Sequence, residues 1–345
     1  MAAKTVKKGT GNGVKGGLSV WLASKFSLAK PKEIVKLFLP LVAMFVMMVM
    51  NGAAADVYPP EEQSVYYPIF IRASMVIYLV CAIISVWFEY FRRHFLKWYG
   101  LIIAFYLISG IYNLCTIHSG IFRLPYFPSF ESMLTYLFEH FGRTMEDLGN
   151  SVALYLQGVT MGAIAGFLWG SAMGYSKHAD YWLNPIIKII GPVPGVAWVT
   201  ISLVLAPSNH FAACVIIAST TWFPLSVNLA GGIRSVSRAA IEKAQTLGAS
   251  HFYIMRHVVY PAAAPSIFTG LFMAFCFSLT SLVTAETMGV KGGLGWRITW
   301  AQSYMSYDII YTIAIIFILM AFVLITILFI VQRHTMSWSK EVVQW

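Results

Sequence analysis

Long apolar stretches dominate the chain, and short polar segments separate them. A helix needs about 20 mostly apolar residues to cross a bilayer. Eight stretches approach or exceed that length: 35–55, 68–90, 98–117, 151–175, 191–207, 210–231, 267–288 and 309–332. The pattern therefore predicts an all-α, polytopic membrane protein with about eight transmembrane helices.

The composition supports a membrane protein and gives its orientation. Hydrophobic residues make up 58% of the chain and charged residues only 11%, against about 25% charged in soluble domains. The formal charge of +10 does not indicate nucleic acid, because the basic residues cluster in short segments beside apolar runs, as the positive-inside rule describes. We expect both termini in the cytoplasm and residues 1–33 to form a flexible basic tail in contact with membrane lipid.

Two further patterns predict local structure. Residues 134–150 are amphipathic at helical spacing, which predicts a surface helix whose wet face carries Glu139, Arg143, Glu146 and Asp147. In the next span, glycine recurs at every fourth position, a ridge that lets a neighbouring helix approach closely. Its members are Gly158, Gly162, Gly166, Gly170 and Gly174. Cysteine and histidine show no metal-ligand spacing, so we expect no metal site.

The segment 232–265 is a polar, basic island between two spans. Its apolar positions recur at helical spacing: Ala240, Ile241, Ala244 and Leu247. Ser237 and Ser250 can cap two short helices, and Gly248 can adopt the left-handed conformation between them. We expect Pro261 to end the second helix. The segment is therefore predicted to be a helix–turn–helix outside the bilayer, and its length suggests a docking surface.

This segment also carries a family motif. The matching residues, in order, are Glu242, Lys243, Ala244, Gly248, Ala249, Val258, Tyr260 and Pro261. They resemble the "EAA" loop of type I ATP-binding-cassette importer permeases, with Lys243 in place of an alanine and Tyr260 in place of a leucine. The resemblance implies that the helix pair inserts into a groove of a cytoplasmic ATPase. The ATPase-coupling residues would then be Glu242, Lys243, Ala244, Gly248, Ala249 and Pro261.

Other motifs resemble one branch of the family, the permeases for nitrate, sulfonate, taurine and bicarbonate. They are Pro192–Trp198, Trp222–Pro224 with Asn228 and Gly232–Arg234, Ala285–Gly289 with Gly292–Gly295, and the outer Leu124–Ser129. This chain departs from the branch at three positions, with Gly191 in place of an arginine, Thr200 in place of a proline and Leu229 in place of a threonine. Without the arginine at 191, the resemblance does not give the charge of the substrate. The resemblance covers residues 98–338, so the spans in 34–97 are predicted to be an addition.

Candidate residues for the translocation path are Trp198, Thr220, Thr221, Asn228 and Glu286. Each also has a structural interpretation. A tryptophan can anchor a span at the interface, threonines can bond their own helix backbone, and an asparagine can link two helices. Glu286 can be functional, since ionisable residues near membrane depth often are, or can pair with Lys291 or Arg297.

The resemblance implies the permease subunit of an importer in a bacterial inner membrane, carrying a small solute such as an organic or inorganic anion. The sequence contains no phosphate-binding Gly-x-x-x-x-Gly-Lys-Ser/Thr loop. We therefore expect no cofactor in this chain, with ATP and Mg²⁺ bound by a partner ATPase. A second copy of the permease and a periplasmic solute-binding protein are the other expected partners. The alternatives are a non-transporting structural or regulatory subunit and, less favoured because the spans hold few reactive groups, a membrane-embedded enzyme.

Overall fold

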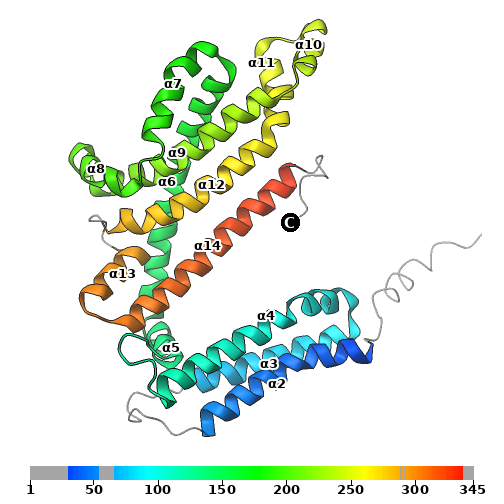
Figure 1. Cartoon of the computed structure of the whole chain (residues 1–345), viewed down its shortest axis with the longest axis vertical. Helices are drawn as coiled ribbons and strands as arrows, with labels where there is room; N and C mark the ends of the chain where they lie inside the picture. The colour runs from blue at the N-terminus through cyan, green and yellow to red at the C-terminus, as the bar shows by residue number, and fades with distance from the viewer. Residues whose placement is uncertain (1–29, 54–65, 288–289, 291, 337–345) are drawn as a thin grey trace, which may run out of the picture. The chain divides into compact units, whose positions relative to one another are not determined.

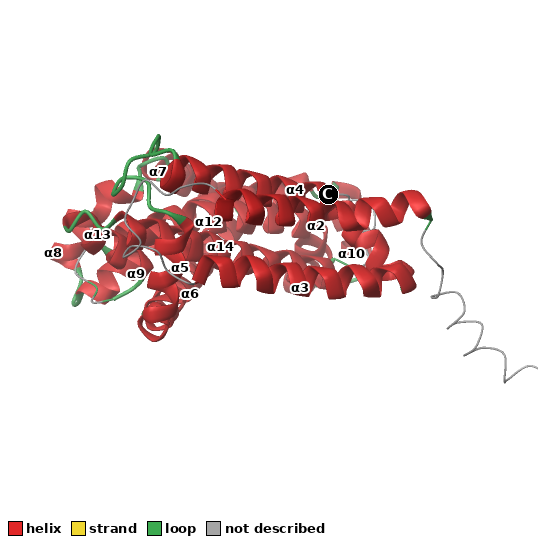
Figure 2. Cartoon of the chain, turned by 90° about the horizontal axis from the view of Figure 1, so that it is seen from below, coloured by secondary structure: helices red, strands yellow, loops and turns green. Residues whose placement is uncertain are grey.

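The computed structural model describes residues 30–53, 66–287, 290 and 292–336, which form helices and connecting loops (Figures 1 and 2). The predicted basic tail falls almost entirely outside the described residues. The chain divides into two compact units, residues 1–135 and residues 136–345. Helix α5 (Phe130–Glu139) crosses the boundary between them. The predicted boundary at residue 97 and the predicted limits of the permease domain stay predictions. In the structure the third long helix packs with the first two.

The first unit is built on three long helices that pack side by side (Figure 1). They are α2 (Pro31–Ala53), α3 (Tyr66–Trp87) and α4 (Glu89–Asn113). Met44, Tyr78 and Ala82 form their core. Buried polar groups are satisfied inside the unit, since the Tyr78 hydroxyl donates to the Leu37 carbonyl at 3.1 Å and the Arg92 Nε lies 3.2 Å from Glu33. Such pairing is what a polar group inside an apolar bundle requires.

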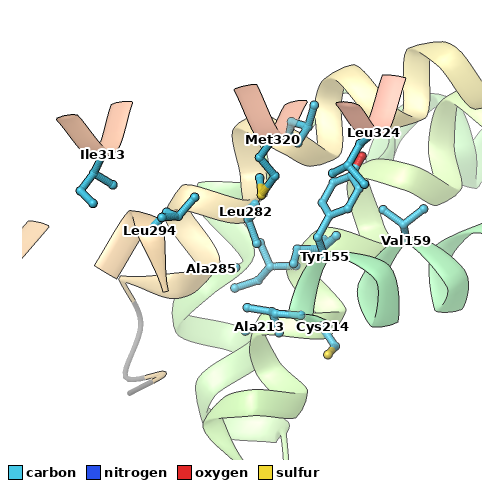
Figure 3. Packing of buried hydrophobic residues seen from close by; sticks show 14 of the residues in the cluster. Tyr155, Val159, Ala213, Cys214, Leu282, Ala285, Leu294, Ile313, Met320 and Leu324 are labelled. Atoms are coloured by element: carbon cyan, nitrogen blue, oxygen red, sulfur yellow. The ribbon is translucent and has the colours of Figure 1, made fainter. Parts of the chain in front are cut away.

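The second unit contains the elements that follow α5. They are α6 (Phe141–Tyr175), α7 (Lys177–Ile190), the short 3₁₀ helix η3 (Gly195–Trp198), α8 (Val199–Leu205), α9 (Asn209–Ser235), α10 (Arg238–Thr246), α11 (His251–Ile254), the π turn η4 (Met255–Val259), α12 (Tyr260–Glu286), α13 (Leu294–Ser303) and α14 (Tyr307–Thr335). Its centre is the triple packing of α6, α9 and α12 (Figure 1). Residues from α6, α9, α12, α13 and α14 form its main apolar core, including Tyr155, Leu282 and Ile313 (Figure 3).

The glycine ridge of α6 lies against α9, as predicted. A methyl group at Gly162 would be 2.5 Å from the Ala218 carbonyl oxygen, and one at Gly170 would be 2.7 Å from the Ser226 carbonyl oxygen. The two backbones are therefore close enough to exclude any side chain between them. Ser226 also donates a hydrogen bond to the Gly166 carbonyl at 3.2 Å.

Seven described helices are long and apolar enough to cross a membrane: 31–52, 66–87, 91–118, 141–175, 209–235, 251–286 and 307–335. The predicted eighth span, 191–207, is not one helix. Instead, α7 and the Gly195–Leu205 helix meet at a bend of 98°. The latter is only about 16 Å long at 1.5 Å per residue, roughly half a bilayer core. Pro192 and Pro194 in the bend explain the break, because neither can donate a helical hydrogen bond.

The prediction of one surface helix over residues 134–150 is also partly wrong. Helix α5 ends at Glu139, and α6 begins at Phe141 and continues without a break into the span. Arg143 and Glu146 are exposed as expected, but Asp147 is only 4% exposed. The Asp147 carboxylate belongs to a buried ion pair, so the amphipathic pattern assigned this one residue to the wrong face.

Pro261 does not end a helix, contrary to prediction. A continuous helical rod runs from His251 to Glu286, with the π turn η4 immediately before α12. Pro261 is the second residue of α12. Proline has no N–H to donate, and the wide π turn directly before it leaves room for the ring inside the continuous rod.

Candidate functional site

The coupling segment, residues 232–265, has the local geometry that its sequence predicts. The Ser237 hydroxyl accepts from the Ala240 N–H at 3.4 Å to cap α10, and Ser250 accepts from Tyr253 at 3.3 Å to cap α11. Gly248 has a φ of +82°. The Gly248 N–H bonds to the Gln245 carbonyl at 2.9 Å, and the Ala249 N–H bonds to the Ala244 carbonyl at 3.1 Å. These two bonds form a Schellman motif, which fixes the angle at which the chain leaves α10.

One side of the coupling segment packs on the spans that flank it. Ile241, Ala244 and Ala249 contact a cluster centred on Leu229 of α9 and Ala263 of α12. The segment is therefore attached to both helices through apolar contacts as well as through the chain. Pro261, at the start of α12, is exposed.

The opposite side of the segment is exposed and partly apolar. Leu247 is 87% exposed and Phe252 75% exposed, and Glu242 and Lys243, earlier on α10, are exposed as well. The prediction that Leu247 shares the packed stripe of α10 is wrong, because Leu247 caps the helix at the start of the turn and projects away. Large apolar side chains gathered at one exposed tip are typical of an interaction surface.

A pocket of about 390 Å³ lies between α9, α12 and the bend after α7. Its lining residues are Gly191, Pro192, Val193, Pro194, Gly195, Val196, Thr220, Phe223, Phe277, Thr280, Ser281 and Thr284. The size is within the range of small-molecule sites, roughly 300–1,000 Å³. A methyl group at Gly191 would overlap the Phe223 ring, so this aromatic side chain fills the space beside the bend.

The structure separates the predicted path residues. Thr220 lines the pocket, whereas Thr221 is fully buried and its Cβ lies where a side chain at Gly162 would be. Asn228 donates to the Pro224 carbonyl at 2.8 Å and packs over Gly270 of α12. Trp198 is half-buried in η3 and is not among the lining residues. Only Thr220 of the five therefore lies at the pocket, and its role there stays a prediction.

Glu286 lies at the far end of α12 inside a separate polar cluster and is 0% exposed. Its carboxylate accepts from the Ser151 hydroxyl and from the Gly295 N–H, each at 2.5 Å. The second donor is in the first turn of α13, where the helix dipole favours a negative charge. Gly293 has a φ of +121°, and a methyl group there would lie 2.7 Å from the carboxylate carbon. The glycine turn thus encloses the carboxylate.

One structural alternative for Glu286 was a pair with Arg297, and the structure contradicts that alternative. The partner of Arg297 is Asp147, with both Nε and Nη2 at 2.7 Å from Oδ2, and the guanidinium also lies over the rings of Trp296 and Trp300. Asp147 also accepts from the Gly293 N–H at 3.2 Å. The other alternative, Lys291, lies outside the described residues. Sequence reasoning placed Asp147 on a wet face and did not single out Ser151, although the two stand one helical turn apart at the entrance to the glycine ridge.

Comparison with known proteins gives the family. Residues 158–337, more than half of the chain, match the family of binding-protein-dependent transport system inner membrane components. The chain belongs to this family. A family member of this kind is the transmembrane component of a transport system and not its ATPase. The matched range includes the glycine ridge, the pocket and the coupling segment.

Individual relatives agree with the family. The taurine transport system permease protein TauC of Escherichia coli is 30% identical over 50% of this chain and 63% of its own length. The nitrate import permease protein NrtB of Synechococcus elongatus is 30% identical over 48% of this chain and 62% of its own length. The match thus spans less than two thirds of either permease. The solved MetNI methionine ABC transporter is similar at 16% identity and a TM-score of 0.48, over 57% of this chain and 98% of that one.

Proposed function

We propose that this family member is the permease subunit of an ATP-driven importer, coupled to a separate ATPase through the coupling segment. The observation that carries the proposal is the exposed tip of that segment. Leu247 and Phe252 project from a turn fixed by two caps and a Schellman motif, while the opposite side is packed on α9 and α12. A rigid element with an exposed apolar tip suits insertion into a groove of a partner.

The same two helices connect the tip to the pocket. Thr220 and Phe223 of α9, and Phe277 and Ser281 of α12, line the pocket. Helix α12 continues α11 in one rod, and α9 ends at Ser235, three residues before α10 begins. A displacement of the tip would therefore move two walls of the pocket together. In this proposal the ATPase binds ATP and Mg²⁺, and its closure changes the access to the pocket.

The remaining partners complete the proposed importer. A second copy of the permease would form the other half of the path, and a periplasmic solute-binding protein would deliver the solute. The protein would lie in a bacterial inner membrane with the coupling segment and both termini in the cytoplasm. The names of the relatives, which include taurine, nitrate, aliphatic sulfonate and bicarbonate permeases, support a small organic or inorganic anion as the solute.

Three substitutions at Gly248 test the coupling role. A Cβ at this position meets nothing within 4 Å, so a substitution acts through backbone conformation alone. Asparagine tolerates the left-handed region and valine does not. We expect Gly248→Asn to copurify with the cognate ATPase and Gly248→Val or Gly248→Pro to lose it, with membrane insertion unchanged in all three.

Glu242→Lys supplies a second test on the exposed face of α10, because it reverses a charge without changing the fold of the segment. We expect ATP turnover that no longer responds to the solute. If Gly248→Val and Glu242→Lys both keep solute-stimulated turnover, the coupling segment does not transmit the ATPase cycle and the proposal is wrong.

A further inference from the structure

The hydroxyl groups at the pocket fall into two classes. Thr220 donates to the Ile217 carbonyl at 2.9 Å, and Thr280 donates to the Phe277 carbonyl at 2.8 Å. Both protons are therefore already used by the backbone of their own helix. Within the described part of the chain, the Ser281 and Thr284 hydroxyls have no hydrogen-bond partner. Two of the four hydroxyls are thus free to bind something that enters the pocket.

The free hydroxyls lie on one face of α12 beside an aromatic wall. Ser281 and Thr284 are three residues apart, and Phe277 is four residues before Ser281, so the three side chains share a side of the helix. Phe223 of α9 lines the same pocket and lies directly against Gly191. The pocket therefore combines two adjacent donors with two aromatic rings.

None of the described residues that line the pocket carries a charge. A small inorganic anion that enters such a site loses its water without gaining a counter-charge, which is costly. A solute with an apolar body offsets part of that cost, because the body is removed from water against the two rings. The lining therefore favours an organic solute over an inorganic one.

We propose that this pocket is the solute site and that it takes a small organic oxyanion, a sulfonate or carboxylate on an apolar and preferably planar body. Ser281 and Thr284 donate hydrogen bonds to its oxygens, and Phe223 and Phe277 contact its body. Neutral donors bind an anion less tightly than an arginine would, which suits a site that must release its solute. This inference rests on the proposed function, and it narrows the solute to one chemical class.

Protection of a cysteine at the pocket tests the inference without any ATPase. The reporter is Val196→Cys, a lining residue with an exposed side chain, in a full chain whose native cysteines are replaced by alanine. Those are Cys81, Cys115, Cys214 and Cys276. The purified protein in nanodiscs is labelled with a small charged methanethiosulfonate reagent, in the presence of benzenesulfonate or of nitrate at the same concentration. Leu247→Cys, exposed on the coupling segment, is the control position.

We expect benzenesulfonate to slow labelling of Val196→Cys, nitrate to leave it unchanged, and neither to affect Leu247→Cys. Ser281→Ala and Thr284→Val should each raise the benzenesulfonate concentration needed for protection by about tenfold. Thr220→Val and Thr280→Val should change it by less than about twofold, because their hydroxyls are already bonded. The labelling rate without ligand reports whether each variant keeps a folded pocket.

Equal protection by nitrate, or equal effects of all four hydroxyl substitutions, would overturn the inference and leave the proposed importer intact. The absence of any protection by benzenesulfonate would overturn it as well. Loss of the coupling role is a separate result, because it is read from ATPase copurification and turnover in the Gly248 variants.

Discussion

The coupling segment and the Glu286 cluster use the same structural means for opposite purposes. Each is a glycine turn beside the end of a helix, with φ of +82° at Gly248 and +121° at Gly293. At Gly248 a Cβ would meet nothing within 4 Å, whereas at Gly293 it would meet the Glu286 carboxylate. The first turn leaves apolar side chains exposed, and the second encloses charges. In our proposal the first turn therefore serves a partner, while the second holds the unit together.

The largest expected effect concerns the enclosed ion pair. Asp147→Ala leaves the Arg297 guanidinium buried without its partner, which typically costs about 3–5 kcal/mol. We expect a marked loss of thermal stability in detergent, measured as a lower unfolding temperature. Arg93→Ala is the control, because it removes an exposed pair with Glu89 worth at most about 1 kcal/mol. Similar stabilities of the two variants would show that the buried pair is not structural.

The intermediate effect compares the two glycines directly. Gly248→Ala forces alanine into the left-handed region at a cost of about 1–2 kcal/mol. Gly293→Ala is strained in the same way, and its methyl group also overlaps the Glu286 carboxylate. The unfolding temperature of the Gly293→Ala variant should therefore fall further. Unfolding of both variants in the same detergent provides the measurement. A larger loss for Gly248→Ala would contradict the enclosure of Glu286.

The smallest effect on stability belongs to the exposed tip. Leu247→Ala and Phe252→Ala remove exposed side chains, so each should change the unfolding free energy by less than about 0.5 kcal/mol. Both should nevertheless reduce the amount of ATPase that copurifies with the chain. Ile121→Ala, which removes a similarly exposed apolar side chain (69% exposed) outside the coupling segment, supplies the control. Reduced stability without reduced copurification would contradict the role of the tip.

Local features of the chain could be predicted, because they depend on residues within one or two helical turns. The caps at Ser237 and Ser250, the turn at Gly248 and the ridge on α6 are of this kind. Features that depend on distant partners could not. From the sequence alone Asp147 is expected at the surface, because its partner Arg297 lies 150 positions later in the chain.

The pocket illustrates the same limit. Its hydroxyls were visible in the sequence, yet which of them are free depends on helix geometry and on the bend after α7. That bend looked like part of a continuous apolar span, because hydropathy does not distinguish a straight helix from two shorter ones. Pro192 and Pro194 supplied the missing signal.

The π turn Met255–Val259 joins α11 to α12 inside one rod. A π turn contains one residue more than an α-helical turn, and each residue of an α-helix advances the side chains by about 100° around the axis. Adding that residue to an unbroken α-helix would turn Ser281 and Thr284 by about that angle relative to Phe252, whereas the wider π turn absorbs it locally as a bulge. The rod therefore accommodates the extra residue next to Pro261 without changing the directions in which its two ends face.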